Sequence, residues 1–175
     1  MSNTLSYVHG ASGQALIGQT IGRYFDEACA RHAGQEALVV RHQNVRLSYA
    51  ELDQQSDRCA ALLAELGVRP ADRVAVFMPN CPQLHITFYA ILKCGAVYAP
   101  VSPLSKALEL SYQLKDSGAR VILCFDQLLD VVQAVSDACE LSAILATSLS
   151  ELCPATPSIP LPDLLRSPKR LAPGV

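Results

Sequence analysis

The fold is decided by two stretches, Asp72-Arg-Val-Ala-Val-Phe-Met-Pro-Asn80 and Leu92-Lys-Cys-Gly-Ala-Val-Tyr-Ala-Pro100. Each contains a short run of apolar and β-branched residues, at 73–78 and 96–99, which is typical of a buried strand. Between them a helical pattern begins at Pro82 and reaches Lys93, because proline suits the first turn of a helix and Gly95 suits its end. Two strands joined by a helix predict parallel strands in one sheet, and the order of the strands stays open.

The alternation of strand and helix continues toward the C-terminus. The expected elements are a helix, a nearly all-apolar strand, a second helix and a short strand, over residues 106–117, 119–125, 128–138 and 142–147. Strands buried on both faces and separated by helices indicate a mainly parallel sheet with flanking helices. The sequence therefore predicts an α/β fold.

The residues before this region are predicted to form a helix, a hairpin and a second helix. The first helix is indicated by one apolar stripe, at Ile21, Tyr24, Phe25, Ala28 and Cys29. The hairpin is expected from two short apolar runs around the polar turn Gln43-Asn44. Ser48-Tyr-Ala-Glu51 has the form of a capping box, and we expect the helix behind it to run to about Glu65.

Composition divides the chain into three regions. Residues 1–19 are a glycine-containing leader, residues 20–150 are the α/β subdomain, and residues 151–175 are a proline-rich connector. Six of the eleven prolines lie in this last region, which has no apolar period and so cannot build a core. Such a connector leads us to expect that further chain follows it.

Length and charge exclude several classes of protein. The 175 residues are 50% hydrophobic and 17% charged, which fits one ordinary domain and excludes intrinsic disorder. A net charge of −2 offers no basic surface for nucleic acid. The uncharged stretch 74–92 is interrupted by Pro79 and Pro82, so we expect no transmembrane segment, and the N-terminus lacks the basic region of a signal peptide.

The seven cysteines are predicted to be structural thiols. They are odd in number, contain no C-x-x-C pair and mostly lie in apolar stretches, where free cysteine behaves as a small hydrophobe. The four histidines are scattered, so no zinc site is expected. A reducing compartment, the cytoplasm, follows as the predicted location.

No catalytic, cofactor-binding or metal-ligating residue is predicted from residue chemistry. The sequence contains no G-x-x-x-x-G-K-[ST], G-x-G-x-x-G or G-x-S-x-G motif. His85 lies in an apolar helical pattern and is interpreted as a core or surface histidine rather than a base. Asp53 and Asp57, beside Arg58, are interpreted as one solvated helix face, and Glu51 is assigned to capping.

Four segments nevertheless carry a specific resemblance. They resemble the first core motifs of the adenylate-forming superfamily and occur in the same order as in that family. They are Leu47-Ser-Tyr-Ala-Glu-Leu52, the two stretches quoted first, and Glu109-Leu-Ser-Tyr-Gln-Leu-Lys-Asp-Ser-Gly-Ala119. Cys94 stands where the family usually has alanine, and Ala99 where it usually has valine. On physical grounds the motif residues are expected to be scaffold: Tyr49, Glu51, Leu52, Lys93, Gly95, Tyr98 and Pro100.

This resemblance implies the N-terminal part of the large domain of an acyl-CoA synthetase. The family's reaction joins a carboxylic acid to CoA at the expense of ATP, releasing AMP and pyrophosphate. The family's phosphate-binding loop, ribose-binding Asp and catalytic Lys lie downstream of this region. We therefore expect the 175 residues to be inactive alone and to bind no cofactor alone. ATP, Mg and CoA are implied for the full enzyme, and the remainder of the ligase chain and a fatty or aryl acid are the implied partners.

Other interpretations stay open at this stage. Val101-Ser-Pro-Leu104 and the segment after it resemble a fatty- or aryl-acid ligase more than a peptide-synthetase domain. A stand-alone truncated member would instead be a non-catalytic interaction module, which could bury its apolar surface by self-association. An unrelated flavodoxin-like nucleotide binder would need a phosphate loop after its first strand, and residues 46–51 are no such loop.

Overall fold

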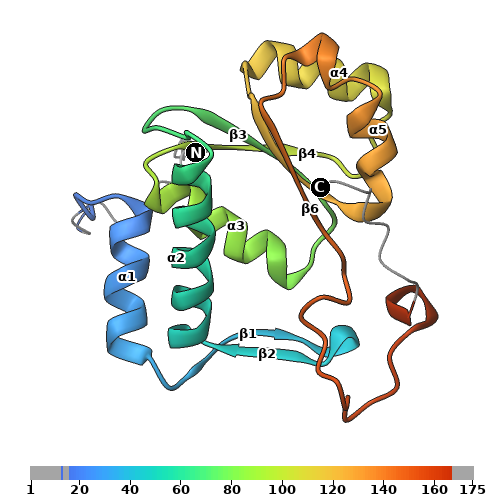
Figure 1. Ribbon diagram of the computed structural model, residues 1–175. Helices are drawn as coiled ribbons and strands as arrows, with labels where there is room; N and C mark the ends of the chain where they lie inside the picture. Colours follow the sequence, from blue (N-terminus) through green and yellow to red (C-terminus); the bar gives the residue numbers. More distant parts are fainter. Residues whose placement is uncertain (1–12, 14–15, 167–175) are drawn as a thin grey trace, which may run out of the picture.

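A parallel four-stranded sheet forms the centre of the molecule. The computed structural model describes residue 13 and residues 16–166. The sheet has the order β4-β3-β5-β6, and all three strand pairs are parallel. Its strands are β3 (Arg73–Phe77), β4 (Val97–Val101), β5 (Val121–Phe125) and β6 (Ala143–Thr147). The predicted α/β fold is confirmed, and the two stretches quoted first supply the neighbours β3 and β4 (Figure 1).

Helices cover both faces of this sheet. One face packs against α2 (Tyr49–Glu65) and α3 (Pro82–Lys93), through a core that includes Leu63, Val76 and Ile91. The other packs against α4 (Ala107–Ser117) and α5 (Leu129–Gln133). Because helices bury β3 and β5 from both sides, the sequences of these strands are almost entirely apolar.

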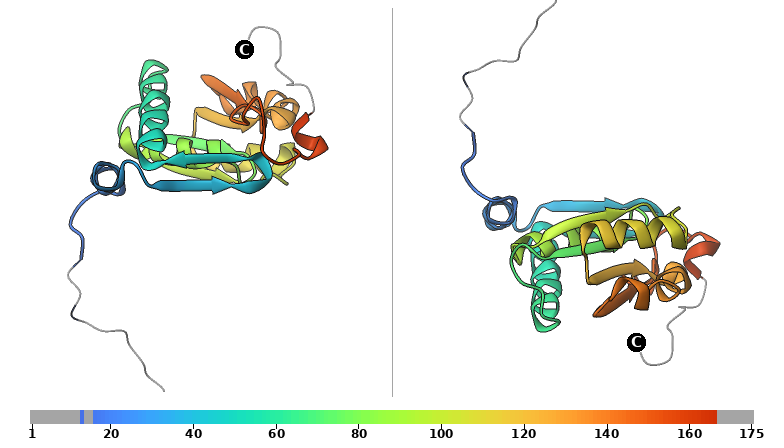
Figure 2. Two further views of the ribbon diagram at one scale, coloured as in Figure 1. Left: turned by 90° about the horizontal axis from the view of Figure 1, so that it is seen from below. Right: turned by 90° about the horizontal axis from the view of Figure 1, so that it is seen from above.

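The N-terminal part forms a separate small layer. Helix α1 (Ile21–His32) and the antiparallel hairpin of β1 (Glu36–Val40) and β2 (Val45–Ser48) surround a third core with Phe25, Leu47 and Leu52. The hairpin turn contains the 3-10 turn η1 (Arg41–Gln43), and Asn44 follows it with a positive φ of 56°. Figure 2 shows the hairpin as a two-stranded ribbon beside the sheet.

The predicted stripe of α1 is partly wrong. The residues that α1 buries are Gly22, Phe25 and Cys29, whereas Ile21 and Tyr24 are 58% and 44% exposed. The cause is a close approach to α3, since a Cβ at position 22 would lie 3.2 Å from the carbonyl oxygen of Leu92. The glycine, which the apolar pattern omits, therefore sets the packed face.

The predicted helix over 128–138 is also wrong in its extent. The chain forms a series of short pieces there, η2 (Asp126–Leu128), α5, and η3 (Asp137–Cys139). The buried residues Leu129 and Val132 lie on α5, and Val135 lies in the turn that follows it. Strand β4 likewise extends beyond the predicted 96–99, because Pro100 is accepted on a strand that lies at the sheet edge.

The remaining expectations concern the ends of the chain and the membrane. Residues 1–12, 14–15 and 167–175, including most of the leader, lie outside the described residues, so the three-region division stays a prediction. Residues 148–162 contain no helix or strand, and η4 (Asp163–Arg166) follows them. In the described part of the chain, no helix has the length and apolarity needed to cross a membrane, and the uncharged stretch 74–92 is divided between β3 and α3.

Candidate functional site

Lys93 lies at the centre of the most highly charged cluster among the described residues. It ends α3, and its side chain is only 10% exposed. Its Nζ is 2.6 Å from Asp53 Oδ1, 2.5 Å from Asp57 Oδ1 and 3.3 Å from Asp26 Oδ1. The first two carboxylates come from α2 and the third from α1, so a single ammonium joins three helices.

The surroundings of Lys93 stabilise its charged form. Burial by itself lowers its pKa, but hydrogen bonds to Asp53 and Asp57, with the negative charges of both, outweigh burial and raise the pKa of Lys93 above its ordinary value. The ring of Phe25 lies 5.4 Å from Nζ and stacks on Tyr89 with centroids 3.6 Å apart. This charged, ring-lined contact fixes α1 against α2 and α3.

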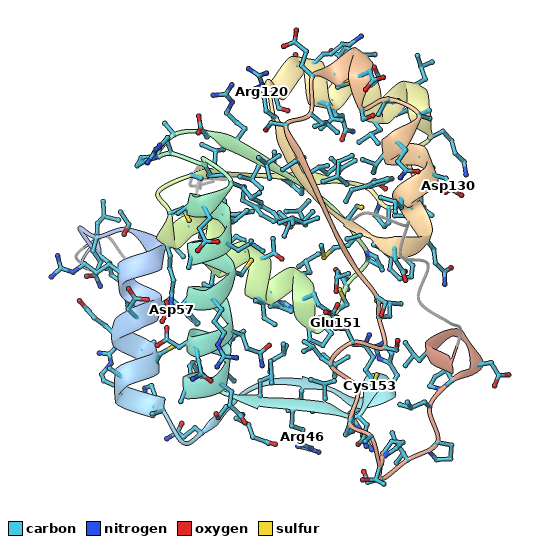
Figure 3. The ribbon with its side chains drawn as sticks, viewed as in Figure 1. Arg46, Asp57, Arg120, Asp130, Glu151 and Cys153 are labelled. Atoms are coloured by element: carbon cyan, nitrogen blue, oxygen red, sulfur yellow. The ribbon has the colours of Figure 1, made fainter. Side chains whose placement is uncertain are left out.

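The prediction that Asp53 and Asp57 form a solvated face is only partly right, because the side chains are 33% and 62% exposed but both pair with Lys93. Their i, i+4 spacing does place them on one face of α2, but that face points toward α1 and α3 rather than toward solvent alone, as Figure 3 shows for Asp57. Sequence reasoning also missed Asp26. The available signal was the lone cation Lys93 at the end of an apolar helix, since a partly buried ammonium needs carboxylate partners.

The other predicted scaffold residues of the second motif lie around the α3–β4 turn. Gly95 adopts a φ of +69°, and a Cβ there would touch Pro70 at 3.4 Å, so the position suits glycine. The Gly95 carbonyl accepts a 2.9 Å hydrogen bond from the Ala71 N–H. Tyr98 packs edge-to-face on Phe88 at 5.2 Å, and Pro100 is exposed on β4.

The predicted scaffold residues of the first motif begin α2. Ser48 is the N-cap, and the reciprocal capping box with Glu51 is present. Leu52 is buried in the third core, and the Tyr49 ring lies 5.8 Å from that of His32. Six of the seven motif residues thus lie at caps, turns and packing contacts, whereas Pro100 is exposed on the edge strand β4.

A groove opens between α2, α3 and β6. Its volume is about 350 Å³. Apolar groups form most of its wall, and its lining includes Cys59, Leu62, Ile86, Leu123, Leu145 and Leu152. Arg58 on α2 and Glu151 after β6 also line it, and the Glu151 label in Figure 3 marks that side.

Two buried glutamines hold the segment that follows β6. Gln43 Nε2 donates to the Leu149 carbonyl at 3.0 Å, and Gln83 Nε2 donates to the Ser148 carbonyl at 2.8 Å. Gln43 is fully buried although it belongs to the polar turn of the hairpin, and Gln83 is 8% exposed. Sequence reasoning missed both, because turn residues and first-turn helix residues are usually solvated.

The thiols and His85 do not form a reactive centre. All seven cysteines are free. Burial raises the pKa of Cys29 and Cys59 to about 11 and that of Cys124 to about 12, which opposes formation of the nucleophilic thiolate. His85 is exposed on α3. Among residues 16–166, no three His, Cys, Asp or Glu side chains are arranged to hold a metal ion.

Comparisons with known proteins identify the same region as similar to ligases. A family model described as AMP-binding enzyme matches residues 25–166. The mitochondrial medium-chain acyl-CoA ligase of Bos taurus is 36% identical over 118 residues, which are 67% of this chain and 19% of that protein. A long-chain-fatty-acid–CoA ligase of Mycobacterium tuberculosis is 36% identical over 100 residues, 57% of this chain and 20% of that protein.

A solved structure agrees with these sequence matches. The crystal structure of the N-terminal domain of FACL13 from Mycobacterium tuberculosis has a TM-score of 0.71 and 27% identity, covering 90% of this chain and 38% of that one. The chain spans about a fifth of the length of the curated relatives that it matches.

Proposed function

The chain belongs to the AMP-binding enzyme family, and on that premise we propose that it forms the N-terminal part of an ATP-dependent acyl-CoA ligase. The proposed reaction converts a carboxylic acid, ATP and CoA into acyl-CoA, AMP and pyrophosphate. The observation that carries the proposal is the 36% identity to an acyl-CoA ligase over two thirds of this chain. The α/β fold is that of the N-terminal part of adenylate-forming enzymes.

We propose that these residues contribute framework rather than catalytic groups. Two cations of the described region are engaged in structural contacts: Lys93 binds three carboxylates, and Arg73 donates to the carbonyls of Ser117 and Gly118. Both side chains therefore support the fold on this proposal. On this proposal the remainder of the ligase binds ATP, Mg and CoA, and the 175 residues alone are inactive.

The proposed substrate class is a fatty acid. The two curated ligases described above are named for medium-chain and long-chain acids, which favours an aliphatic over an aromatic acid. The predicted cytoplasmic location stays a prediction, and the Bos taurus relative is named as mitochondrial.

An assay of acid-dependent ATP–pyrophosphate exchange tests the proposal in two forms. The purified chain, given octanoate, palmitate or benzoate, is expected to show no exchange. A chimera in which residues 25–166 replace the corresponding region of the Mycobacterium tuberculosis long-chain ligase is expected to exchange with fatty acids, with the intact ligase as control.

Two results would count against it. Exchange by the chain alone would show that the framework assignment is wrong. A chimera that is folded by circular dichroism and monodisperse, yet inactive with every acid, would contradict the assignment to a ligase scaffold.

A further inference from the structure

Helix α4 presents one apolar face to the core and a second one to solvent. Leu110 and Leu114 form the buried face and pack in one core with residues of β3 and β5. On the outer side, Leu108 and Tyr112 are 83% and 71% exposed. Leu104, in the turn that leads into the helix, is also 83% exposed. A surface helix of a globular domain needs only the face that meets the core, so packing within the domain does not explain the second face.

The exposed apolar residues share one side of the helix with a cation. Leu108 and Tyr112 are four residues apart, which places them on the same face, one turn from each other. Lys115 is exposed and follows Tyr112 by three residues, so its ammonium ends this face. The acidic residues Glu109 and Asp116 lie about a quarter of a turn around the helix from Leu108. We call this surface the outer α4 face, which consists of Leu104, Leu108, Tyr112 and Lys115.

The outer α4 face lies on the outside of the layered fold. Helix α4 packs against β4, α5 and η3, and it runs along the outer margin of the molecule (Figure 1). Further strands of the same domain would extend the sheet at β4 or β6, in the plane of the sheet. They would not cover a helix face that points away from the sheet. A larger sheet therefore does not account for the exposed residues of α4.

The size and chemistry of the outer α4 face fit a lipid surface better than a protein partner. A stable protein interface engages roughly 20–30 residues a side, whereas this face offers three apolar side chains on a convex helix. A helix that lies in a membrane interface needs only such an apolar face, which enters the boundary between headgroups and acyl chains. Tyrosine is enriched at the level of the headgroups, and lysine side chains extend along apolar surface to reach them.

We propose that the outer α4 face binds the surface of a phospholipid bilayer. Leu104 and Leu108 enter the boundary between headgroups and acyl chains, and Tyr112 lies at the level of the headgroups. The Lys115 ammonium contacts lipid phosphate groups. Insertion of the leucines supplies the attraction, because removing apolar area from water drives association. This association goes beyond the proposed ligase function and does not depend on it.

Vesicle flotation measures the binding. The wild-type chain is expected to float with vesicles of phosphatidylcholine and phosphatidylethanolamine. Leu108→Glu is expected to weaken partitioning by about tenfold or more, because it removes one inserted leucine and adds an anion. Leu62→Glu places the same charge on α2, at a leucine that is 41% exposed, and is expected to float like the wild type.

A single tryptophan gives a readout that is specific to α4. The chain contains no tryptophan, so Tyr112→Trp introduces one fluorescent reporter on the outer α4 face. Its emission is expected to shift to shorter wavelength when vesicles are added, because the indole leaves water. Tyr24→Trp, at a 44% exposed position of α1, is the matched control and is expected to show no shift.

Circular dichroism checks that each variant is folded. A wild-type chain that does not float, a folded Leu108→Glu variant that floats equally well, or an unshifted emission of Tyr112→Trp would each overturn the proposal. Wild-type self-association that light scattering detects, that Leu108→Glu abolishes and that occurs without vesicle binding would also overturn it. That last result would assign the face to a contact between proteins.

Discussion

Lys93 shows how much of the packing depends on one side chain. Among the described residues, Lys93 alone forms ion pairs with both α1 and α2, and its three partners are all aspartates. A sequence motif that places a lysine at a helix end suggests only an interaction with the helix dipole. The structure adds a tertiary role, because removing the ammonium would leave three carboxylates close together.

Replacing Lys93 by methionine is expected to reduce the free energy of unfolding by about 2 kcal/mol. A fully buried ion pair would contribute more, because the three aspartates here are 33–62% exposed to solvent. Urea unfolding measures the change. Lys115→Met, at an exposed position of α4, is the matched control and is expected to be nearly neutral. Equal effects of the two substitutions would refute the role assigned to Lys93.

Glu51 is expected to make the stability depend on acidic pH. Hydrogen bonds from the Ser48 backbone N–H and hydroxyl hold the pKa of Glu51 below its ordinary value of 4.5. A lowered folded-state pKa stabilises the protein above the unfolded value, and this contribution is lost as the pH falls through the folded value. The stability difference between wild type and Glu51→Gln should therefore shrink below pH 4.5 in urea unfolding at a series of pH values. A difference independent of pH would rule this out.

At the scale of elements, the junctions between helices and strands are held by a few polar contacts. Arg73 at the start of β3 donates to the Ser117 carbonyl at 2.7 Å and to the Gly118 carbonyl at 3.2 Å, which satisfies the end of α4. Gln83 and Gln43 do the same for the segment after β6. Each contact pairs a carbonyl that regular secondary structure leaves unbonded.

Gly118→Ala is expected to destabilise the α4–β5 junction by about 1–2 kcal/mol. Gly118 has a φ of +66°, and an added Cβ would lie 2.6 Å from Arg73 Nη2, so the guanidinium would have to move. Gly34→Ala serves as the control, because its Cβ would meet nothing within 4 Å. Thermal unfolding of both variants is the measurement, and an equal melting temperature for both would show that the junction tolerates a side chain.

The strands of the sheet are expected to differ in amide exchange. Strand β3 is paired on both sides, whereas β6 has one neighbour among the described residues. Exchange should therefore be slow in Arg73–Phe77 and faster in Ala143–Thr147, because edge strands open more easily. Hydrogen exchange read by mass spectrometry tests this. Equal protection of the two strands would contradict it.

At the scale of the whole molecule, local sequence signals predicted most of the helices and strands, whereas tertiary contacts decided which residues are buried and which are paired. Capping at Ser48 and Glu51, proline at the start of α3 and the apolar strands were all readable, because each depends on neighbours in sequence. The bonding of Asp26 to Lys93, the burial of Gln43 and the packed face set by Gly22 were not readable. Each depends on a residue from another element, which a periodicity of 3.6 or 2 does not encode.

The buried thiols are expected to react only when the whole molecule opens. Cys29, Cys81, Cys124 and Cys139 are buried, and burial raises the pKa of the first three. Iodoacetamide labelling at neutral pH should be slow at these four in the native chain and complete in urea. Mass spectrometry locates the labels, and rapid native labelling of Cys124 would contradict the packing described for β5.

The contact between the hairpin and the segment after β6 also bears on the order of events during folding. Gln43 and Leu149 are 106 residues apart, and Ser158 donates to Asn44 across 114 residues, so these bonds close the longest loops described. Closing a long loop lowers the conformational entropy of the chain before the contact adds any stabilising free energy. The sheet, built from nearer neighbours, should therefore condense first, and the C-terminal segment should be the last part to dock and the first to detach.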